Sequence, residues 1–381
     1  NCCNALLVPC NSECCYGIQK EKFLIRTALM KLKRLLVSLI SVSLLFLAPG
    51  CAKKSIDTTE LSQSDSLENG DLTVIGFSQL GAESDWRSAN TQSMKETFTE
   101  ENGYRLIFED GQQKQANQIM AIRKFIQQDV DYIVLAPVTE TGWDTVLREA
   151  KDAGIPVIIV DRMVDVDDDS LYECWVGSDF KLEGLKVCTW LSEYCKKKHI
   201  DPSTLRIVDL QGNLGATAQI GRTIGLSESA RKYGWSVLEY VPADFTQTKG
   251  REVMSNLLEK YNNINVVYCE NDNEALGAIE AIEAAGRKAG SDIKNGEIMV
   301  LSFDGVNEEA RKYVTENKIS CIAECNPHHG PRVKGIIEKL KSGQEPPKLS
   351  YVGEEIYVHD NAVDKIRIDN IEYSITVLEL E

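Results

Sequence analysis

The sequence predicts an α/β protein of two lobes, each a doubly wound parallel sheet covered by helices on both faces. From Leu72 onward, short β-branched runs alternate with longer amphipathic stretches, the pattern of βαβ units. Ten such runs exceed one ordinary sheet, and 381 residues allow two domains. Polar residues follow most runs, at the sheet edge where open α/β proteins bind ligands.

The segment before the fold is interpreted as a targeting sequence. Residues 30–50 combine the basic stretch Met30–Arg34, the apolar run Leu35–Leu47 and small residues before Cys51. This pattern is typical of a bacterial lipoprotein signal peptide, whose cysteine receives lipid and begins the mature chain. The apolar run is shorter than the about 20 residues that span a bilayer. We expect an exported protein that meets the membrane only through a lipid anchor on Cys51.

Two flanking segments are also set apart from the fold. Residues 1–29 precede the signal, do not begin with Met and hold five of the twelve cysteines. We interpret them as non-native upstream sequence; a Cys-rich metal or redox extension is the alternative, although the spacing matches no clear zinc pattern. Residues 51–70 are rich in Ser, Thr and Asp, which predicts a flexible tether. The six later cysteines permit disulfides or buried free thiols.

Composition limits the class of partner. With 43% apolar and 26% charged residues the chain is globular in composition, and its net charge is −16. Because binding phosphates needs a basic face, no nucleic-acid partner is expected.

The predicted strands alternate with helices along most of the chain. The strands are Leu72–Phe77, Arg105–Glu109, Tyr132–Leu135, Val157–Val160, Tyr172–Val176, Arg206–Leu210, Val237–Tyr240, Val266–Cys269, Ile298–Phe303 and Ser320–Ala323. The helices are Ala89–Asn102, Gln115–Gln128, Thr141–Ala153, Phe180–Lys197, Thr217–Tyr233, Lys249–Lys260, Asn273–Ala285 and Glu308–Asn317.

The loop after the first strand, Gln79–Arg87, carries the first candidate site. It offers carboxylates, a hydroxyl, an indole and a guanidinium, the groups that grip a small polyhydroxylated molecule. A simpler interpretation is a helix N-terminus with Ser84 or Asp85 as the cap and Trp86 in the core. Similar polar residues follow the later strands, so we expect them to converge where the two sheet edges face each other.

At this point the sequence resembles the periplasmic sugar-binding proteins of ABC transporters of the ribose and galactose type, and within them the galactofuranose-binding members. The resemblance rests on GFSQLGAESDWR, EDGQQKQANQI, LAPVTETGW, IPVIIVDR, LQGNLGA, DFTQTKGREVM, END and FDG. It implies a type I periplasmic binding protein fold with three hinge strands. The first lobe would comprise residues 71–177 plus 326–353 and the second 178–325 plus 354–381.

The resemblance also implies a sugar site and a transport role. We expect capture of a monosaccharide for an ABC transporter permease, by a monomer at the periplasmic or extracellular face of the cytoplasmic membrane, without cofactor or metal. Asp85 replaces a glycine and Gln247 an arginine of a galactofuranose-binding member, which bears on the sugar that fits. The implied sugar-binding residues are Glu83, Ser84, Asp85, Trp86, Arg87, Asp161, Arg162, Arg222, Phe245, Asn271, Asp304 and Glu324.

The residues also bear on several other functions. Asp161 with Asp304 would suit a glycosidase, but the interleaved arginines hold carboxylates ionised, which favours binding. The glycines of Gln211–Gly215 do not match a phosphate-binding loop. The run Asp165–Asp169 lacks the glycine and the closing Glu of a calcium-binding loop. We interpret His328-His329 as part of a surface turn and not as a metal site. A sugar-responsive repressor needs a helix-turn-helix where the signal lies. A sensory role beside a membrane receptor stays open.

Overall fold

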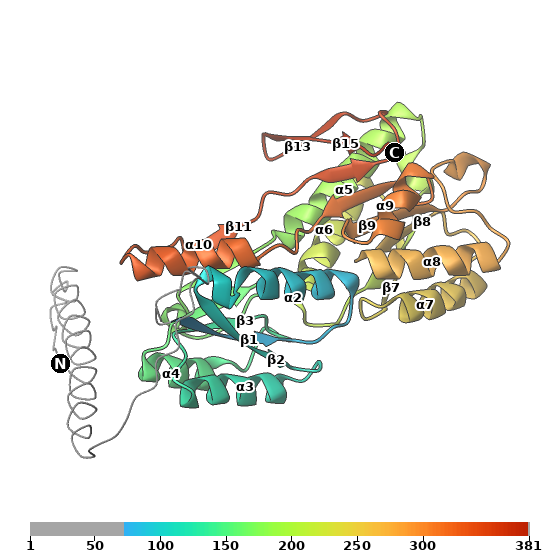
Figure 1. The fold of residues 1–381 in the computed structure, drawn as a ribbon. Coiled ribbons are helices and arrows are strands. Elements are labelled where there is room, and N and C mark those ends of the chain that lie inside the picture. Colours follow the sequence, from blue (N-terminus) through green and yellow to red (C-terminus); the bar gives the residue numbers. More distant parts are fainter. Residues whose placement is uncertain (1–71, 380–381) are drawn as a thin grey trace, which may run out of the picture. The chain divides into compact units, whose positions relative to one another are not determined.

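The computed structural model describes residues 72–379, which form two lobes, each around its own sheet (Figure 1). The predicted upstream segment, signal peptide, lipid-attachment residue Cys51 and tether all lie outside the described residues. Within residues 72–379, no helix has the length and apolar character needed to cross a membrane.

The first sheet has six parallel strands in the order β11-β5-β4-β3-β1-β2. Successive side chains of β3 point to opposite faces, so Ile133 and Leu135 join one core cluster and Val134 the other. Helices α3 (Gln115–Gln127) and α4 (Asp144–Ala153) cover the first face, and α2 (Asp85–Thr97) and α10 (Gly330–Lys341) the second (Figure 1). The strands are β1 (Thr73–Gln79), β2 (Tyr104–Asp110), β3 (Tyr132–Leu135), β4 (Val157–Val160), β5 (Cys174–Gly177) and β11 (Leu349–Tyr351).

The second sheet has seven strands in the order β15-β12-β10-β9-β8-β6-β7, parallel except where β12 pairs with β10. One face packs against α5 (Phe180–Lys197) and α6 (Thr217–Tyr233). The other packs against α7 (Gln247–Lys260), α8 (Asp272–Ala284) and α9 (Glu308–Thr315). The strands are β6 (Arg206–Gln211), β7 (Ser236–Pro242), β8 (Val266–Cys269), β9 (Met299–Asp304), β10 (Cys321–Glu324), β12 (Ile356–Val358) and β15 (Thr376–Val377).

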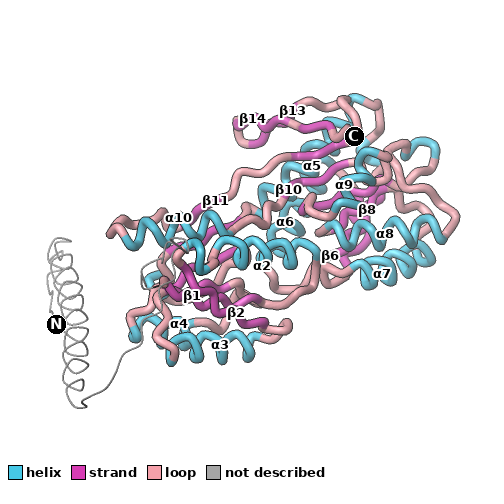
Figure 2. Tube along the Cα trace, in the orientation of Figure 1, coloured by secondary structure: helices cyan, strands magenta, loops and turns pink. Residues whose placement is uncertain are grey.

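A hairpin of β13 (Lys365–Ile368) and β14 (Ile371–Ser374) forms a separate two-stranded sheet (Figure 2). Its two turn residues, Asp369 and Asn370, both have positive φ, 47° and 67°, the backbone of a two-residue type I′ turn. Four short 3₁₀ helices complete the described secondary structure: η1 (Glu100–Asn102), η2 (Asp169–Leu171), η3 (Pro202–Thr204) and η4 (Ile293–Asn295).

Three chain segments cross between the two sheets, after β5, after β10 and between β11 and β12. Glu354 in the third segment fastens the other two, because its Oε1 accepts hydrogen bonds from the Ser178 hydroxyl at 2.5 Å and from the Asn326 N–H at 2.9 Å. Glu324 also joins segments, since its Oε2 accepts from the Glu355 N–H at 2.9 Å. The three crossings therefore form one connected hinge.

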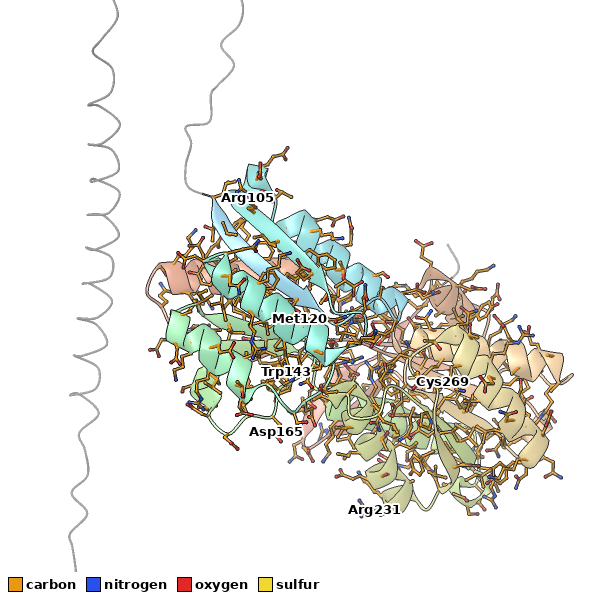
Figure 3. The ribbon with its side chains drawn as sticks, turned by 90° about the horizontal axis from the view of Figure 1, so that it is seen from below. Arg105, Met120, Trp143, Asp165, Arg231 and Cys269 are labelled. Carbon is orange, nitrogen blue, oxygen red and sulfur yellow. The ribbon has the colours of Figure 1, made fainter. Side chains whose placement is uncertain are left out.

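Each lobe has its own packed interior. Figure 3 labels Trp143 in the first lobe and Cys269 in the second, and both side chains are fully buried. The six cysteines of the described chain are all unpaired and buried, which confirms the free-thiol alternative over disulfides. Both lobes are thus stabilised mainly by apolar packing on the two faces of a sheet.

Candidate functional site

A cavity of about 30 Å³ lies where the carboxyl edges of the two sheets meet. Residues from both lobes and from the hinge line it: Glu83, Ser84, Trp86, Arg87, Asp161, Arg162, Phe180, Ala218, Arg222, Phe245, Asn271, Asp304 and Cys325.

The first-lobe loop is shaped by the start of α2. Ser84 is the N-cap, and its Oγ accepts a hydrogen bond from the Arg87 N–H at 3.2 Å. The helix therefore begins at Asp85, four residues before the predicted start at Ala89. Its first turn holds Trp86 and Arg87 in buried positions. The simpler interpretation of this loop, a capped helix with Trp86 buried, is correct, and the same turn lines the cavity.

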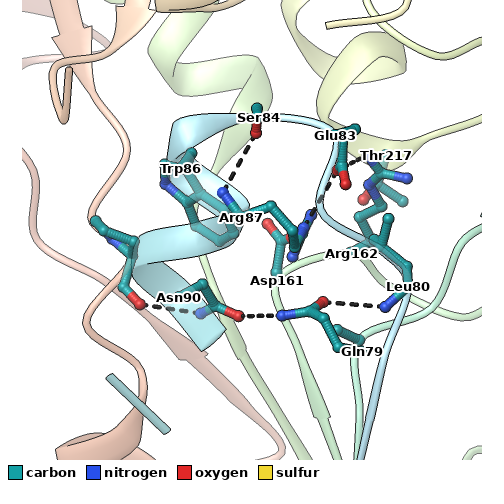
Figure 4. Close-up of polar contacts among 12 residues, drawn as sticks. Gln79, Leu80, Glu83, Ser84, Trp86, Arg87, Asn90, Asp161, Arg162 and Thr217 are labelled. Atoms are coloured by element: carbon teal, nitrogen blue, oxygen red, sulfur yellow. Dashed lines mark hydrogen bonds and ion pairs between the residues drawn. The ribbon is translucent and has the colours of Figure 1, made fainter. Parts of the chain in front are cut away.

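Two arginines and two carboxylates form a connected chain of contacts in the first lobe (Figure 4). Arg87 donates from Nε to Glu83 at 3.2 Å and from Nη2 to Asp161 at 2.5 Å. Arg162 donates from Nη2 to the same Glu83 oxygen at 3.2 Å and from Nη1 to the carbonyl of Val138 at 3.2 Å. Two N–H groups of this network, Nη1 of Arg87 and Nε of Arg162, are buried and have no partner among the described residues. Both arginines line the cavity, so each has hydrogen-bonding capacity that the described residues leave unused.

Arg222 is the centre of the second-lobe half. Its Nε donates to Glu183 Oε2 at 2.8 Å, its Nη2 to Asp304 Oδ1 at 3.1 Å, and its Nη1 to the carbonyl of Glu270. The guanidinium also lies 4.8 Å from the ring centroid of Phe303, a cation–π contact. Contacts on every side fix the orientation of this side chain before any ligand arrives.

Unusual backbone geometry occurs at three cavity residues. Asp161, Phe245 and Asp304 have φ of 63°, 59° and 90°, in the left-handed region that non-glycine residues seldom adopt. Such strain concentrates at ligand sites, where surrounding contacts maintain it. For Phe245, space is made by Gly212, because a Cβ built there would lie 1.9 Å from the phenyl ring. Gly212 of the Gln211–Gly215 loop therefore leaves the space that the Phe245 ring occupies in the cavity wall.

Burial and neighbouring charges set the ionisation of the cavity carboxyls. Burial alone would raise the pKa of Glu83 and of Asp161, but the charges of Arg87 and Arg162 outweigh it and hold both pKa values below the ordinary range. Asp304 differs, because burial raises its pKa to about 6 although Arg222 opposes the rise. The cavity thus presents two firmly ionised carboxylates and one that titrates near neutral pH.

Further carboxyls lie buried in the second lobe behind the cavity. Burial raises the pKa of Glu270 to about 8 and that of Asp272 to about 8. Asp209 is shifted well upward by burial and by the nearby Glu270, and neither of its oxygens has a partner among the described residues. These groups favour the protonated form in the folded chain.

Aromatic rings form the apolar walls. Trp86, Phe180 and Phe245 all line the cavity, and Trp86 Nε1 donates to the carbonyl of Cys325 at 2.6 Å, which ties the indole to the hinge. His329 packs edge-on against Trp86, with ring centroids 5.7 Å apart. It is fully buried, so the interpretation of both histidines as a surface turn is wrong for His329; only His328 is exposed. Burial lowers the pKa of His329 to about 4, which keeps the ring neutral at physiological pH.

Ten of the twelve predicted sugar-binding residues line the cavity, and two do not. Asp85 is exposed and contacts Asn273 and Asn307 of the second lobe. Glu324 belongs to the end of β10 and bonds within the hinge. The ten that converge are Glu83, Ser84, Trp86, Arg87, Asp161, Arg162, Arg222, Phe245, Asn271 and Asp304.

Three lining residues were missed by the sequence reasoning: Phe180, Ala218 and Cys325. Cys325 could have been predicted from the strand pattern. Strand β10 ends at Glu324, one residue later than predicted, so the first residue after the strand is Cys325 and not Glu324. Phe180 follows the strand-end pair Ser178-Asp179, where Asp179 is the N-cap of α5. Ala218 carries no polar signal, so its place was visible only in three dimensions.

One group of potential metal ligands occurs among the described residues. The ligand atoms of Glu183, Cys325 and Glu354 lie within 4.8 Å of one another. Glu183 already pairs with Arg222, and Glu354 accepts from Ser178 and Asn326. Burial raises the pKa of the Cys325 thiol well above its ordinary value, which disfavours the thiolate that a metal needs. The group is therefore accounted for by hinge and arginine contacts.

Two lobes, a three-stranded hinge and a polar cavity between sheet edges define a ligand-binding protein of the periplasmic type. Residues 75–329 match the family described as a periplasmic binding protein domain, and the chain belongs to this family. Galactofuranose-binding protein YtfQ of Escherichia coli is 39% identical over 298 residues, which cover 77% of this chain and 90% of YtfQ.

Two solved structures show the same likeness. A protein from Mycobacterium smegmatis in complex with β-D-fucofuranose has 39% identity and a TM-score of 0.70, and the match covers 76% of this chain and 92% of that one. The periplasmic binding protein component of the arabinose ABC transporter from Shewanella sp. ANA-3, bound to α- and β-L-arabinofuranose, has 39% identity and a TM-score of 0.69, over 76% and 93% of the chains. The predicted family and the predicted type I fold are confirmed.

Proposed function

We propose that this protein captures a monosaccharide in its furanose form, galactofuranose or a near relative, and delivers it to an ABC importer. The observation that carries the proposal is the cavity itself, in which guanidinium and carboxylate groups alternate with three aromatic rings. Planar charged groups satisfy pairs of sugar hydroxyls, and ring C–H faces pack on aromatic planes. The relatives named above bind furanose sugars, which supports the ring form.

The charge balance of the cavity supports a neutral ligand. In the first-lobe network two ionised carboxylates, Glu83 and Asp161, face two guanidinium groups, Arg87 and Arg162. An anionic sugar would add an unbalanced charge to a buried site, and that carries a large desolvation cost. Hydroxyl groups, in contrast, both donate to the carboxylates and accept from the free arginine N–H groups.

The mechanism is closure of two lobes around the sugar. Each lobe supplies half of the lining, so only the closed arrangement completes the set of hydrogen bonds, and the ligand stabilises that arrangement. Sugars that leave a buried group unpaired are rejected, because the unsatisfied group keeps its desolvation penalty. No chemical step is required of any residue.

The test is calorimetric titration of the compact unit Leu67–Glu381 with a galactofuranoside, arabinose, ribose and galactose. We expect micromolar or tighter binding of one furanose-forming sugar, with the sugar recovered unchanged after prolonged incubation. Absence of binding, or consumption of the sugar, would contradict the proposal and bring the enzyme and receptor alternatives forward.

We further propose that Cys51 carries a lipid anchor and that the chain acts as a monomer at the outer face of the cytoplasmic membrane. The support is the signal-like segment before Cys51 in the sequence. Labelling with a radioactive fatty acid should mark the wild type and not Cys51→Ser. We also propose the boundaries of the two lobes. The first lobe comprises residues 71–177 plus 326–353, and the second comprises residues 178–325 plus 354–381. Limited proteolysis tests these boundaries by the ends of the fragments that resist cleavage.

A further inference from the structure

Asp85 lies outside the cavity and joins the two lobes directly. Its carboxylate Oδ2 accepts hydrogen bonds from the side-chain amides of Asn273, at 3.1 Å, and of Asn307. Its backbone N–H donates to Asn273 Oδ1 at 3.2 Å. Asp85 belongs to the first lobe, and both asparagines belong to the second. One residue therefore makes three hydrogen bonds from one lobe to the other, and none of the three residues involved lines the cavity.

The electrostatic setting favours an acid at this position. Asp85 is in the first turn of α2, Asn273 is in the first turn of α8, and Asn307 is the N-cap of α9. The positive ends of three helix dipoles converge on one carboxylate, and a negative charge is stabilised at a helix N-terminus. Alanine at this position would lose both this attraction and the two amide bonds.

These bonds exist only while the lobes are closed. When the hinge opens, Asp85 separates from Asn273 and Asn307, and all three side chains return to water. The contact therefore adds to the closing equilibrium without adding to the affinity of the closed cavity for sugar. Another lobe-to-lobe hydrogen bond, from the Met163 N–H to Thr217 Oγ1 at 3.2 Å, is formed by a neutral hydroxyl acceptor.

We propose that Asp85 is a latch, an affinity-determining residue that sets how tightly sugar is held by stabilising the closed state from outside the cavity. The latch rests on the proposed sugar-binding function of the cavity. Since the bonds form after the sugar has entered the open cleft, their loss speeds sugar release and leaves association unchanged.

The expected loss of sugar affinity is modest, because the hydrogen bonds of Asp85 are partly exposed to water. Removal of the carboxylate in Asp85→Ala should weaken sugar binding about tenfold, mostly as a faster dissociation rate. If the wild type is mostly open without ligand, Asp85→Ala makes closure harder and so lowers the sugar affinity. If the wild type is mostly closed without ligand, Asp85→Ala shifts it toward the open form, which small-angle scattering detects as an expansion. One or both readouts must change.

A reversed pair separates the latch from simple loss of structure. Asn307→Asp keeps the oxygen that caps Ala310 N–H, but places a second carboxylate against Asp85, so affinity should fall further than in Asp85→Ala. The double variant Asp85→Asn with Asn307→Asp restores one amide and one carboxylate with their places exchanged. It should recover most of the affinity.

The matched control is another aspartate–asparagine pair that stays within one lobe. Asn295 Nδ2 donates to Asp292 Oδ2 at 2.7 Å in the second lobe. Asp292→Ala should leave both the dissociation rate and the scattering profile of the wild type unchanged.

The experiment measures Kd, dissociation rate and ligand-free scattering for the wild type and these variants, with a galactofuranoside and arabinose as probes. Unchanged Kd and unchanged scattering in Asp85→Ala, or no recovery in the reversed pair, would overturn the latch. If the wild type binds none of the sugars, the proposed function fails, and the latch, which rests on it, fails with it. If the wild type binds sugar and Asp85→Ala behaves like the wild type in every readout, the latch alone fails.

Discussion

Arg162 offers the sharpest test of the cavity. Its guanidinium is buried and donates to Glu83 and Val138, its Nε has no partner among the described residues, and the residue lines the cavity. A hydrogen bond that involves a charged group contributes roughly 1.5–3 kcal/mol. If Nε donates to a sugar hydroxyl, Arg162→Ala should raise Kd about 10- to 100-fold, because each 1.4 kcal/mol is a factor of ten.

The same substitution disturbs the charge balance of the first lobe. Two carboxylates, Glu83 and Asp161, would then share the single guanidinium of Arg87. Breaking a buried ion pair by removing one partner costs about 3–5 kcal/mol of folding free energy. Arg162→Lys keeps the charge but lacks the planar fork, so it should fold and still bind about tenfold more weakly.

The assay is isothermal titration with the preferred sugar, together with a melting curve for each variant. Arg123→Ala is the matched control, because Arg123 forms an exposed pair with Glu149 on the surface of the first lobe. Its Kd should equal that of the wild type. The reasoning is refuted if Arg162→Ala and Arg162→Lys are both folded and bind with a Kd within about twofold of the wild type.

Three further outcomes are expected. Trp86→Ala should weaken sugar binding by about 1–3 kcal/mol, because the ring and its bond to Cys325 are lost, whereas Trp86→Phe should retain most of the affinity in the same titration. Sugar affinity should fall as pH drops through about 6, since protonation of Asp304 replaces a charged hydrogen-bond acceptor for a sugar hydroxyl with a weaker neutral one, and Asp304→Asn should flatten that profile. The melting temperature should fall as pH rises from 5 toward 8, because the folded chain holds protons on carboxyls such as Asp209 and Asp272 that the unfolded chain has already released. Each such proton contributes at most about 1.4 kcal/mol per pH unit, and Asp209→Asn should reduce the slope; a melting temperature that rises with pH would contradict the assignment.

Sequence reasoning located most of the cavity because its residues follow strands. Asp161 comes directly after β4, and Asn271 and Phe245 lie in the loops after β8 and β7. The position of such residues depends only on where a strand ends and which edge of the sheet it reaches. An error of one residue at a strand end was enough to name Glu324 in place of Cys325.

The orientation of a helical side chain was harder to predict. Asp85 and Trp86 are neighbours in the first turn of α2, yet the indole enters the cavity and the carboxylate turns to the other lobe. Neighbouring residues on a helix point about 100° apart. The same helical turn therefore lines the cavity and contacts the second lobe, and the order of residues in the sequence does not show which residue does which. Which face of helix α2 contacts the second lobe depends on how the two lobes close, and the sequence alone does not indicate that arrangement.

The C-terminal elements were not predicted individually. Helix α10 begins at Gly330-Pro331, a pair that reads as a turn, although Pro is well suited to the first turn of a helix. The hairpin β13–β14 is short and largely exposed, so it lacks the apolar alternation of a buried strand. Its Asp369-Asn370 turn was the available signal, because these residue types tolerate the left-handed backbone.

The triple crossing has a consequence for how the chain is made. Strand β11, at the edge of the first sheet, pairs with β5 about 170 residues earlier in the chain. The first lobe therefore stays incomplete until nearly the whole polypeptide has emerged, and a product cut short before Leu349 lacks the edge strand of one sheet and two strands of the other. Neither half can be taken out as a continuous piece of sequence, so maturation and breakdown should each proceed as events of the entire chain.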